Sequence, residues 1–196
     1  MSKKIFLFFG VFIFFVSVSA QQTGKKYFFQ QVSWSITLHP DFIPLDSVAD
    51  QALKEKGVKA ISDANDIDMG ESKTISLISA GKGEHNYFNC NITPYDLKKD
   101  GDYEASGKNV KNIVYKTFKD QIPDGKIDTT TTKIFIDGLE FDKFQVIVSI
   151  NDKELLHMLV LSKYYKGYDF GITYLYLDPV TKEQIEKMLN ESKFTK

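Results

Sequence analysis

Apolar and polar residues alternate over several stretches of the chain, and a period of two is typical of β-strands. The alternation is cleanest over residues 32–38 and 144–150, where one side of each stretch is apolar and the other is polar. Residues 74–79 and 87–93 are two further candidate strands, and the Gly-containing loop 81–84 between them predicts a hairpin. These stretches predict strands that bury one side in a core.

Other stretches follow a helical spacing. Apolar residues three and four positions apart predict a helix over residues 105–120. An earlier helix begins after the capping residue Asp46 and ends near Gly57, and the sequence leaves open whether the following residues continue it. The last helix begins at Asp178, with Thr181 as an alternative capping residue.

Two later strands, over residues 155–161 and 172–177, are apolar on both sides. Such strands must be covered on both faces, which hairpins alone would not achieve. We therefore predict an α+β domain in which an antiparallel β-sheet is sandwiched between helices, in three layers (α/β/α). The length suits one domain, which we place at residues 31–196 after a leader at residues 21–30.

The first twenty residues have the pattern of a secretory signal peptide. Lys3 and Lys4 precede an apolar run from Ile5 to Val16, and a set of small residues ends at Ala20. The uninterrupted apolar stretch is shorter than the roughly 20 residues that span a membrane, so we expect cleavage rather than the alternative, a stable membrane anchor. The sequence thus predicts an exported protein that works in the periplasm or outside the cell.

Every basic residue is a lysine, and the lysines are interspersed with acidic residues rather than gathered in one block. Without Arg, the chain lacks the planar group that binds phosphate or guanine at two points. The formal net charge is −1 and becomes about −3 once Lys3 and Lys4 are removed with the signal. These features argue against nucleic acid as a partner.

The candidates for chemistry do not assemble into a known motif. Cys90 is the single cysteine and shares the apolar side of a predicted strand, which favours a buried thiol over a nucleophile. His39, His85 and His157 are not spaced as metal ligands, and we expect His157 to be a hydrogen-bonded core residue and the other two to face solvent. Since nucleophile elbows and phosphate-binding loops are also missing, we assign no catalytic, metal-binding or cofactor-binding residue and expect no cofactor.

Two groups of acidic residues leave alternatives open. Residues 63–71 form a predicted polar loop rich in oxygen ligands, but they lack the ligand order and the glycine position of a calcium loop. Whether this loop binds a cation stays open. Asp137, Glu140 and Asp142 flank a Gly turn, and we expect exposed carboxylates there rather than a catalytic pair.

Three segments carry a resemblance to a known fold. They are residues 34–42, a strand that runs into a Pro turn; residues 134–141, a strand, a Gly turn and a strand; and residues 168–177, which precede the helix ending at residues 189–194. With this order of elements, most of the mature chain resembles the PsbP/Mog1-like fold and its exported bacterial members. The resemblance implies an accessory or binding protein without catalytic activity, and it carries over no site residue.

Tyrosines concentrate on two neighbouring predicted strands near the C-terminus, where Tyr164, Tyr165, Tyr174 and Tyr176 lie. Strand packing is the simpler explanation for them. Tyrosine also suits a surface that is apolar on one side and wet on the other, so they are the first candidates for binding a protein or a small apolar ligand. We expect an exported, non-enzymatic accessory or binding protein, and the alternative is a hydrolase whose site is assembled from distant loops.

Overall fold

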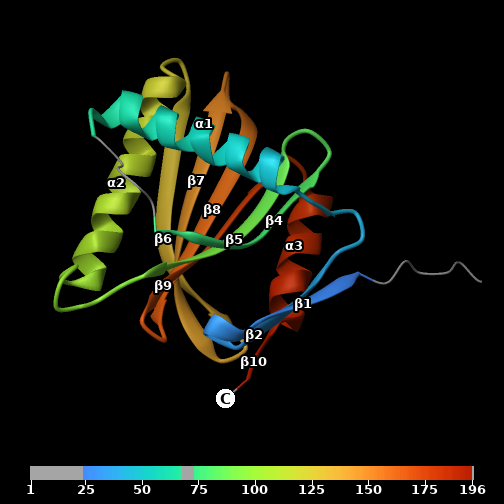
Figure 1. The fold of residues 1–196 in the computed structure, drawn as a ribbon. Helices are drawn as coiled ribbons and strands as arrows, with labels where there is room; N and C mark the ends of the chain where they lie inside the picture. The colour runs from blue at the N-terminus through green and yellow to red at the C-terminus, as the bar shows by residue number, and fades with distance from the viewer. Residues whose placement is uncertain (1–23, 68–72, 196) are drawn as a thin grey trace, which may run out of the picture.

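The computed structural model describes residues 24–67 and 73–195, which form two antiparallel sheets and three α-helices (Figure 1). The large sheet has seven strands in the order β3-β4-β5-β9-β8-β7-β6. These strands are β3 (Ile43–Pro44), β4 (Ile75–Lys82), β5 (Asn86–Pro94), β6 (Lys126–Ile136), β7 (Leu139–Ile150), β8 (Lys153–Tyr165) and β9 (Tyr168–Tyr176). The four strands β6 to β9 follow one another as a meander of antiparallel neighbours.

A second, smaller sheet contains β1 (Lys25–Phe29), β2 (Trp34–Leu38) and β10 (Lys193–Phe194) in the order β1-β2-β10. The 3-10 helix Gln30–Val32 joins its first two strands. The small sheet therefore brings the first described strand and the last strand of the chain to either side of β2 (Figure 1). Within the stretch predicted as a leader, residues 25–29 form β1, which pairs with β2 along its whole length.

The helices are α1 (Ser47–Asn65), α2 (Tyr103–Gln121) and α3 (Pro179–Glu191). Each begins directly after an aspartate, Asp46, Asp102 or Asp178, whose side chain accepts a hydrogen bond from a backbone N–H in the first turn. At α3 the capping residue is Asp178, and the alternative cap Thr181 instead donates both its backbone N–H and its hydroxyl to Asp178. None of the helices in the described ranges is long and apolar enough to cross a membrane.

Helix α1 is longer than the sequence predicts. It continues past Gly57 to Asn65, so the first residues of the predicted polar loop at 63–71 are helical. Asp66 ends the helix in a left-handed conformation, with its N–H bonded to Ser62 O. Residues 68–72, which hold the rest of that predicted loop, lie outside the described ranges.

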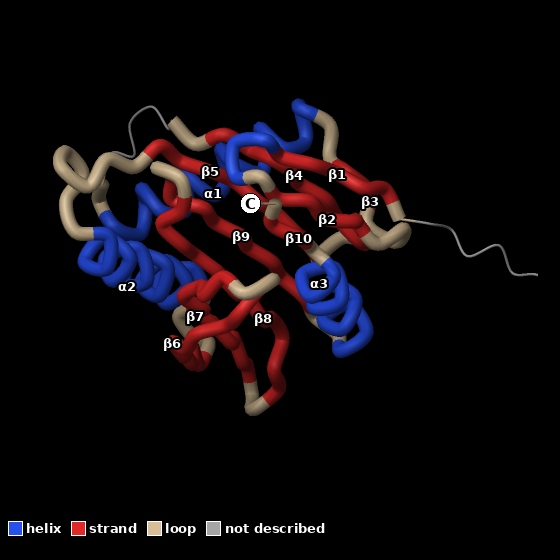
Figure 2. The backbone as a smooth tube through the Cα atoms, turned by 90° about the horizontal axis from the view of Figure 1, so that it is seen from below, coloured by secondary structure: helices blue, strands red, loops and turns tan. Residues whose placement is uncertain are grey.

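The two faces of the large sheet pack against different elements. One face forms the larger core with the small sheet and α3, and its largest fully buried side chains include Trp34, Phe88, Phe141 and Phe170. The other face packs Phe144 and its neighbours on β7 against Val114, Phe118 and Ile122 of α2 and its C-terminal cap. Figure 2 shows α2 and α3 on opposite sides of the strands.

The prediction of a mixed α+β chain with an antiparallel sheet and three helices is confirmed. The layers are less regular than predicted, because the side that holds α3 also holds the small sheet. The sequence pattern did not predict this second sheet, since β10 has only two residues and β1 lies in a stretch assigned to a leader.

Candidate ligand cleft between helix α2 and the sheet

The face of the large sheet beneath α1 and α2 is polar along its central strands. Asn91 of β5, Gly171 of β9 and Ser162 of β8 are direct neighbours in the register, so they face the same side. Asn89 and Thr173 form the next row on that side. Because side chains alternate along a strand, these polar residues lie opposite the apolar core of the other face.

A chain of hydrogen bonds ties this polar face to α1. Asn91 Nδ2 donates to Asn89 Oδ1 (2.9 Å), and Asn89 Nδ2 donates to Ser79 Oγ (2.7 Å). Ser79 Oγ donates in turn to Asp50 of α1, which also pairs with Lys54 at 2.8 Å. Burial raises the pKa of Asp50, but the hydrogen bonds from Lys54 and Ser79 outweigh burial and leave that pKa below its usual value. The chain of bonds holds the Asn91 amide in one orientation.

A cleft of about 190 Å³ lies between α2 and this part of the sheet. Two glycines shape it. A Cβ added to Gly171 would lie 2.9 Å from Asn91 Oδ1, so the small residue on β9 makes room for the amide. A Cβ added to Gly107 of α2 would meet no atom within 4 Å, so a larger residue there would extend into free space.

The lining of the cleft divides into an apolar part and a polar part. Val110 and Val114 of α2 and Phe144 and Val160 of the sheet supply the apolar side chains. The polar side chains come from both walls and are Asn91, Tyr103, Ser106, Lys111, Ser162, Asp169 and Thr173. Such a mixture of apolar surface and a few converging polar groups is typical of small-molecule sites.

Asp169 is the acidic residue of the cleft. Its Oδ1 accepts a hydrogen bond of 2.6 Å from the hydroxyl of Tyr103, the first residue of α2. Burial raises the pKa of Asp169 above its usual value, and the hydrogen bond from Tyr103 opposes this only in part. Burial also raises the pKa of Tyr103, and the neighbouring Asp169 carboxylate raises it further. The ionised form of Asp169 is therefore incompletely compensated by its surroundings.

Lys111 of α2 is the basic residue of the cleft. Within the described ranges, neither Lys111 nor Asp169 has an ion-pair partner with an N···O distance of 4.0 Å or less. The cleft thus contains one acidic and one basic side chain that do not neutralise each other.

Three tyrosine rings pack together at the start of α2, and one of them, Tyr103, lines the cleft. Tyr103 packs against Tyr95 with ring centroids 5.3 Å apart, and Tyr164 lies 6.0 Å from Tyr95 and 5.9 Å from Tyr103. The rings touch one another, so they form a wall beside Asp169 rather than an open cage.

The four tyrosines predicted as a binding surface are separated in the structure. Tyr174 and Tyr176 are only 1% and 5% exposed and belong to the larger core, because their positions on β9 face the side of α3. Tyr165 is partly buried against the same core, whereas Tyr164 is 36% exposed and packs against the cleft residue Tyr103. Of the four, Tyr164 is therefore the one that remains a candidate for a binding surface. Whether a partner docks there stays a prediction.

The residues considered for catalysis or metal binding lie elsewhere. Cys90 is fully buried in the larger core, and burial raises the pKa of its thiol well above the usual value. His85 is exposed beside Glu84, and His39 is partly exposed beside Asp41. In the described ranges, no three His, Cys, Asp or Glu residues come together as metal ligands.

His157 differs from the hydrogen-bonded core imidazole that we expected. Its ring stacks on Tyr176 with centroids 4.8 Å apart, and its Nε2 lies 3.2 Å from Glu154. Its buried Nδ1 has no hydrogen-bond partner in the described part of the chain. The residue is held mainly by its ring contact.

The acidic residues around the Gly138 turn have structural contacts. Asp137 accepts hydrogen bonds from Lys193 and from the backbone N–H of Phe194, and both lower the pKa of its carboxyl. Glu140 and Asp142 both pair with a lysine of β6, Lys133, at 3.3 and 2.7 Å. Asp137 thus secures β10, and the other two carboxylates join neighbouring strands.

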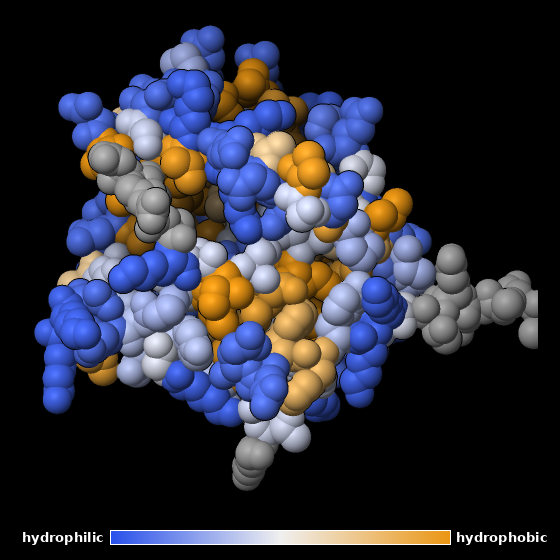
Figure 3. All heavy atoms as spheres, in the orientation of Figure 1, coloured by the Kyte–Doolittle hydropathy of each residue, from blue (hydrophilic) through white to orange (hydrophobic). Residues whose placement is uncertain are grey.

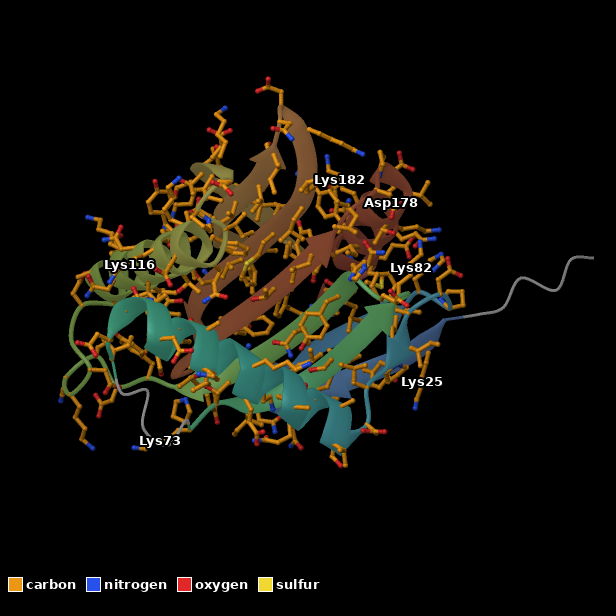
Figure 4. All side chains as sticks on the ribbon, turned by 90° about the horizontal axis from the view of Figure 1, so that it is seen from above. Lys25, Lys73, Lys82, Lys116, Asp178 and Lys182 are labelled. Atoms are coloured by element: carbon orange, nitrogen blue, oxygen red, sulfur yellow. The ribbon has the colours of Figure 1, made fainter. Side chains whose placement is uncertain are left out.

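Lysines are spread over the molecule. Figure 4 shows Lys82, Asp178 and Lys182 near one another at the start of α3, whereas Lys25 and Lys116 lie on other sides. Lys82 also lies 3.8 Å from Asp41, so this group contains both signs of charge.

A second, wider hollow of about 640 Å³ lies between β1 and β4. Phe28 and Ile75 on its walls are 58% and 45% exposed, and Figure 3 shows apolar side chains gathered over these strands. The polar residues that line this hollow are Gln30, Gln31 and Ser76. In the described ranges it therefore lacks the charged groups that line the α2 cleft.

Comparisons with known proteins bear on the fold. The sequence matches no protein-family model and no curated protein. The structure is similar to the solution structure of cyanobacterial PsbP (CyanoP) from Synechocystis sp. PCC 6803, with a TM-score of 0.56 and 11% sequence identity. The match covers 91% of this chain and 96% of that chain. The chain thus has a PsbP-like fold, as its sequence resemblance predicts.

The cleft was not predicted from the sequence. Its polar residues come from strands that are far apart in the sequence, and only the register brings Asn91, Ser162 and Gly171 into one row. One local signal was present, because Gly107 lies inside a predicted helix where glycine is unfavourable. A glycine at such a position often has a packing or functional reason.

Proposed function

We propose that this protein is an exported, non-enzymatic accessory protein that holds a small ligand in the cleft between α2 and the sheet. The observation that carries the proposal is the cleft itself, which Gly107 leaves unfilled although a larger side chain would fit the α2 wall. A void of this size lined by polar side chains has room for about six water molecules or for a ligand of comparable volume.

Two further points support the accessory role. The pattern of Met1 to Ala20 predicts export, away from cytosolic cofactors. The fold is also similar to that of a cyanobacterial PsbP, and this likeness supports a non-catalytic role by analogy of fold alone. In this proposal the chain has the predicted α/β/α layers, with α2 in one outer layer and α3 in the other. The cleft would then lie between the α2 layer and the sheet.

The cleft's chemistry favours binding. Asp169 and Tyr103 are the groups with raised pKa values there, and the hydroxyl donates to the carboxylate rather than being activated by it. A Ser or Thr nucleophile in the cleft would need a neighbouring base, but Asp169 accepts its hydrogen bond from Tyr103, and the three histidines are not among the lining residues. For this reason the structure adds no observation that favours a hydrolase.

Ligand-observed NMR tests the proposal. The mature protein is mixed separately with indole, p-cresol, 3-methylbutylamine, 4-methylpentanoate and L-leucine, and saturation transfer is measured. We expect at least one of these probes to bind and Gly107→Leu to abolish its binding, because the leucine side chain would occupy the cleft. The matched control is Gly57→Leu, since Gly57 is also a helical glycine with no atom within 4 Å of an added Cβ.

Both substitutions replace glycine in a helix, so both are expected to keep or raise stability. A loss of binding in Gly107→Leu alone is therefore not explained by unfolding. If no probe binds in a way that Gly107→Leu removes, the proposed function is wrong.

A further inference from the structure

Asp169 and Lys111 line the same cleft with opposite charges and no ion-pair partners in the described ranges. We propose that the cleft binds a small zwitterion with an apolar body, which is the chemistry of an aliphatic α-amino acid. The inference rests on the proposed function and names the ligand class of that same site. The ammonium group of the bound zwitterion would meet Asp169, and its carboxylate would meet Lys111.

The sheet wall of the cleft, which carries Asp169, is suited to an ammonium group. Asp169 Oδ1 is used by the Tyr103 hydroxyl, which leaves Oδ2 without a hydrogen-bond partner in the described ranges. Asn91 Oδ1 lies over Gly171 in the same cleft, and its amide is oriented because Nδ2 donates to Asn89. Two acceptor oxygens, one of them anionic, therefore stand ready for N–H donors.

Burial makes the ionised form of Asp169 unfavourable when no ligand is bound. A carboxylate that is largely removed from water, with one hydroxyl donor, is stabilised less than a carboxylate in solution. A bound cation would supply the missing compensation. This is a physical reason for the cleft to prefer a ligand with a positive charge over a neutral one.

The basic residue comes from α2, the wall that faces the strand of Asp169. Lys111 follows Val110, one turn of helix after Gly107, and lines the cleft. A lysine ammonium without an acidic neighbour is a point-charge site for an anion. A ligand with a single positive charge would satisfy Asp169 but would be repelled by Lys111, whereas a zwitterion satisfies both.

The apolar lining and the volume limit the rest of the ligand. Val110, Val114, Phe144 and Val160 offer a surface for a short hydrocarbon chain. With about 190 Å³ available, a side chain of the size of leucine is suitable.

Isothermal titration calorimetry at neutral pH tests the inference with three compounds of one carbon skeleton. L-leucine carries both charges, 3-methylbutylamine lacks the carboxylate, and 4-methylpentanoate lacks the amine. We expect each singly charged analogue to bind at least about tenfold more weakly than leucine, since each lacks one charged hydrogen-bond partner.

Two substitutions assign the charges. Asp169→Asn keeps an acceptor for Tyr103 and is expected to weaken leucine binding at least about tenfold while leaving 4-methylpentanoate within about twofold. Lys111→Met keeps the apolar stem and is expected to weaken leucine similarly while leaving 3-methylbutylamine unchanged or tighter. Gly57→Leu serves as the control that should alter neither affinity.

The outcomes separate this inference from the proposed function. If either singly charged analogue, indole or p-cresol binds as tightly as leucine, or if leucine binding ignores both charge substitutions, the zwitterion inference is overturned. Binding of any of these probes that is still lost in Gly107→Leu leaves the proposed function standing. If none of the probes binds to the cleft, both are overturned.

Discussion

At the scale of single residues, Asp169 connects stability with the cleft. Its side chain is mostly buried, and the Tyr103 hydroxyl is its one hydrogen-bond donor in the described ranges. Burial disfavours the charged form of a carboxyl, and one neutral donor offsets only part of that effect. The protein therefore keeps an acid where an amide of the same shape would be more favourable, which is typical of a residue retained for binding.

The raised pKa of Asp169 predicts a pH dependence. Because the folded-state pKa lies above the usual value of 3.8, the folded protein holds this proton more tightly than the unfolded chain. Asp169 therefore lowers the free energy of unfolding as pH rises through the interval between the two values. Asp169→Asn cannot ionise, so its stability relative to wild type should be higher at pH 7 than at pH 3.

Urea unfolding of both proteins at the two pH values measures this difference. Other carboxylates, such as Asp137 and Asp178 with their lowered pKa values, contribute to both proteins and cancel. A stability difference that is independent of pH, or larger at pH 3, would contradict the assignment.

The position of Tyr174 in β9 determines how much the residue contributes to stability. On β9 it faces the larger core and is 1% exposed, so Tyr174→Ala should lower the free energy of unfolding by about 3–5 kcal/mol, the range for large buried aromatic residues. Tyr164→Ala, at a residue that is 36% exposed, should lower it by about 1 kcal/mol through lost ring contacts. Chemical denaturation of the two variants measures both values, and equal effects would contradict the assignment of Tyr174 to the core.

The two tyrosines also show the limit of sequence analysis at this scale. Tyrosine occurs in strands both for packing and for binding, and composition does not distinguish the two. In β9 the residues Phe170, Ile172, Tyr174 and Tyr176 share the buried side, so once the strand's bounds are known its alternation places both tyrosines there. The structure adds that α3 and the small sheet cover this side, whereas Tyr164 of β8 is left partly exposed.

At the scale of elements, the pattern of the chain predicted most strands and helices. The stretch 144–150 falls in β7, and the stretch 32–38 forms β2 from Trp34 onward, after the 3-10 helix that contains Val32. Asp46 and Asp178 cap α1 and α3 as expected. These predictions worked because each depends on residues close in sequence, a period of side chains or a capping side chain.

Elements that depend on distant contacts were not predictable. Helix α1 continues through Gly57, and its second half is held by contacts with α2, such as the 3.0 Å hydrogen bond from Asn65 Nδ2 to Thr117 Oγ1. Strand β1 forms because β2 offers it a partner over its full length. In both cases tertiary packing overrides the local preference of the sequence.

At the scale of the whole molecule, one sheet serves two purposes. Its first face supplies a continuous apolar core with α3 and the small sheet, while the central strands of its second face remain polar beneath α1 and α2. The core on the first face accounts for stability without a disulfide or metal in the described ranges. On the second face a smaller apolar cluster packs β7 against α2, and the polar side chains of the neighbouring strands line the cleft beside it.

The location of the whole molecule is the remaining prediction, and it rests on residues 1–20, which lie outside the described ranges. Expressed at full length in a Gram-negative bacterium, the protein should appear in the periplasm or the medium with Gln21 as its first residue, because small residues precede that bond. Phe9→Lys interrupts the apolar run and should keep the protein in the cytoplasm at full length, whereas the matched Phe9→Leu should be exported. Cell fractionation and mass spectrometry of the intact protein measure both properties. Recovery of wild type from the cytoplasm with its first twenty residues in place would contradict export, and recovery from the membrane would favour the anchor.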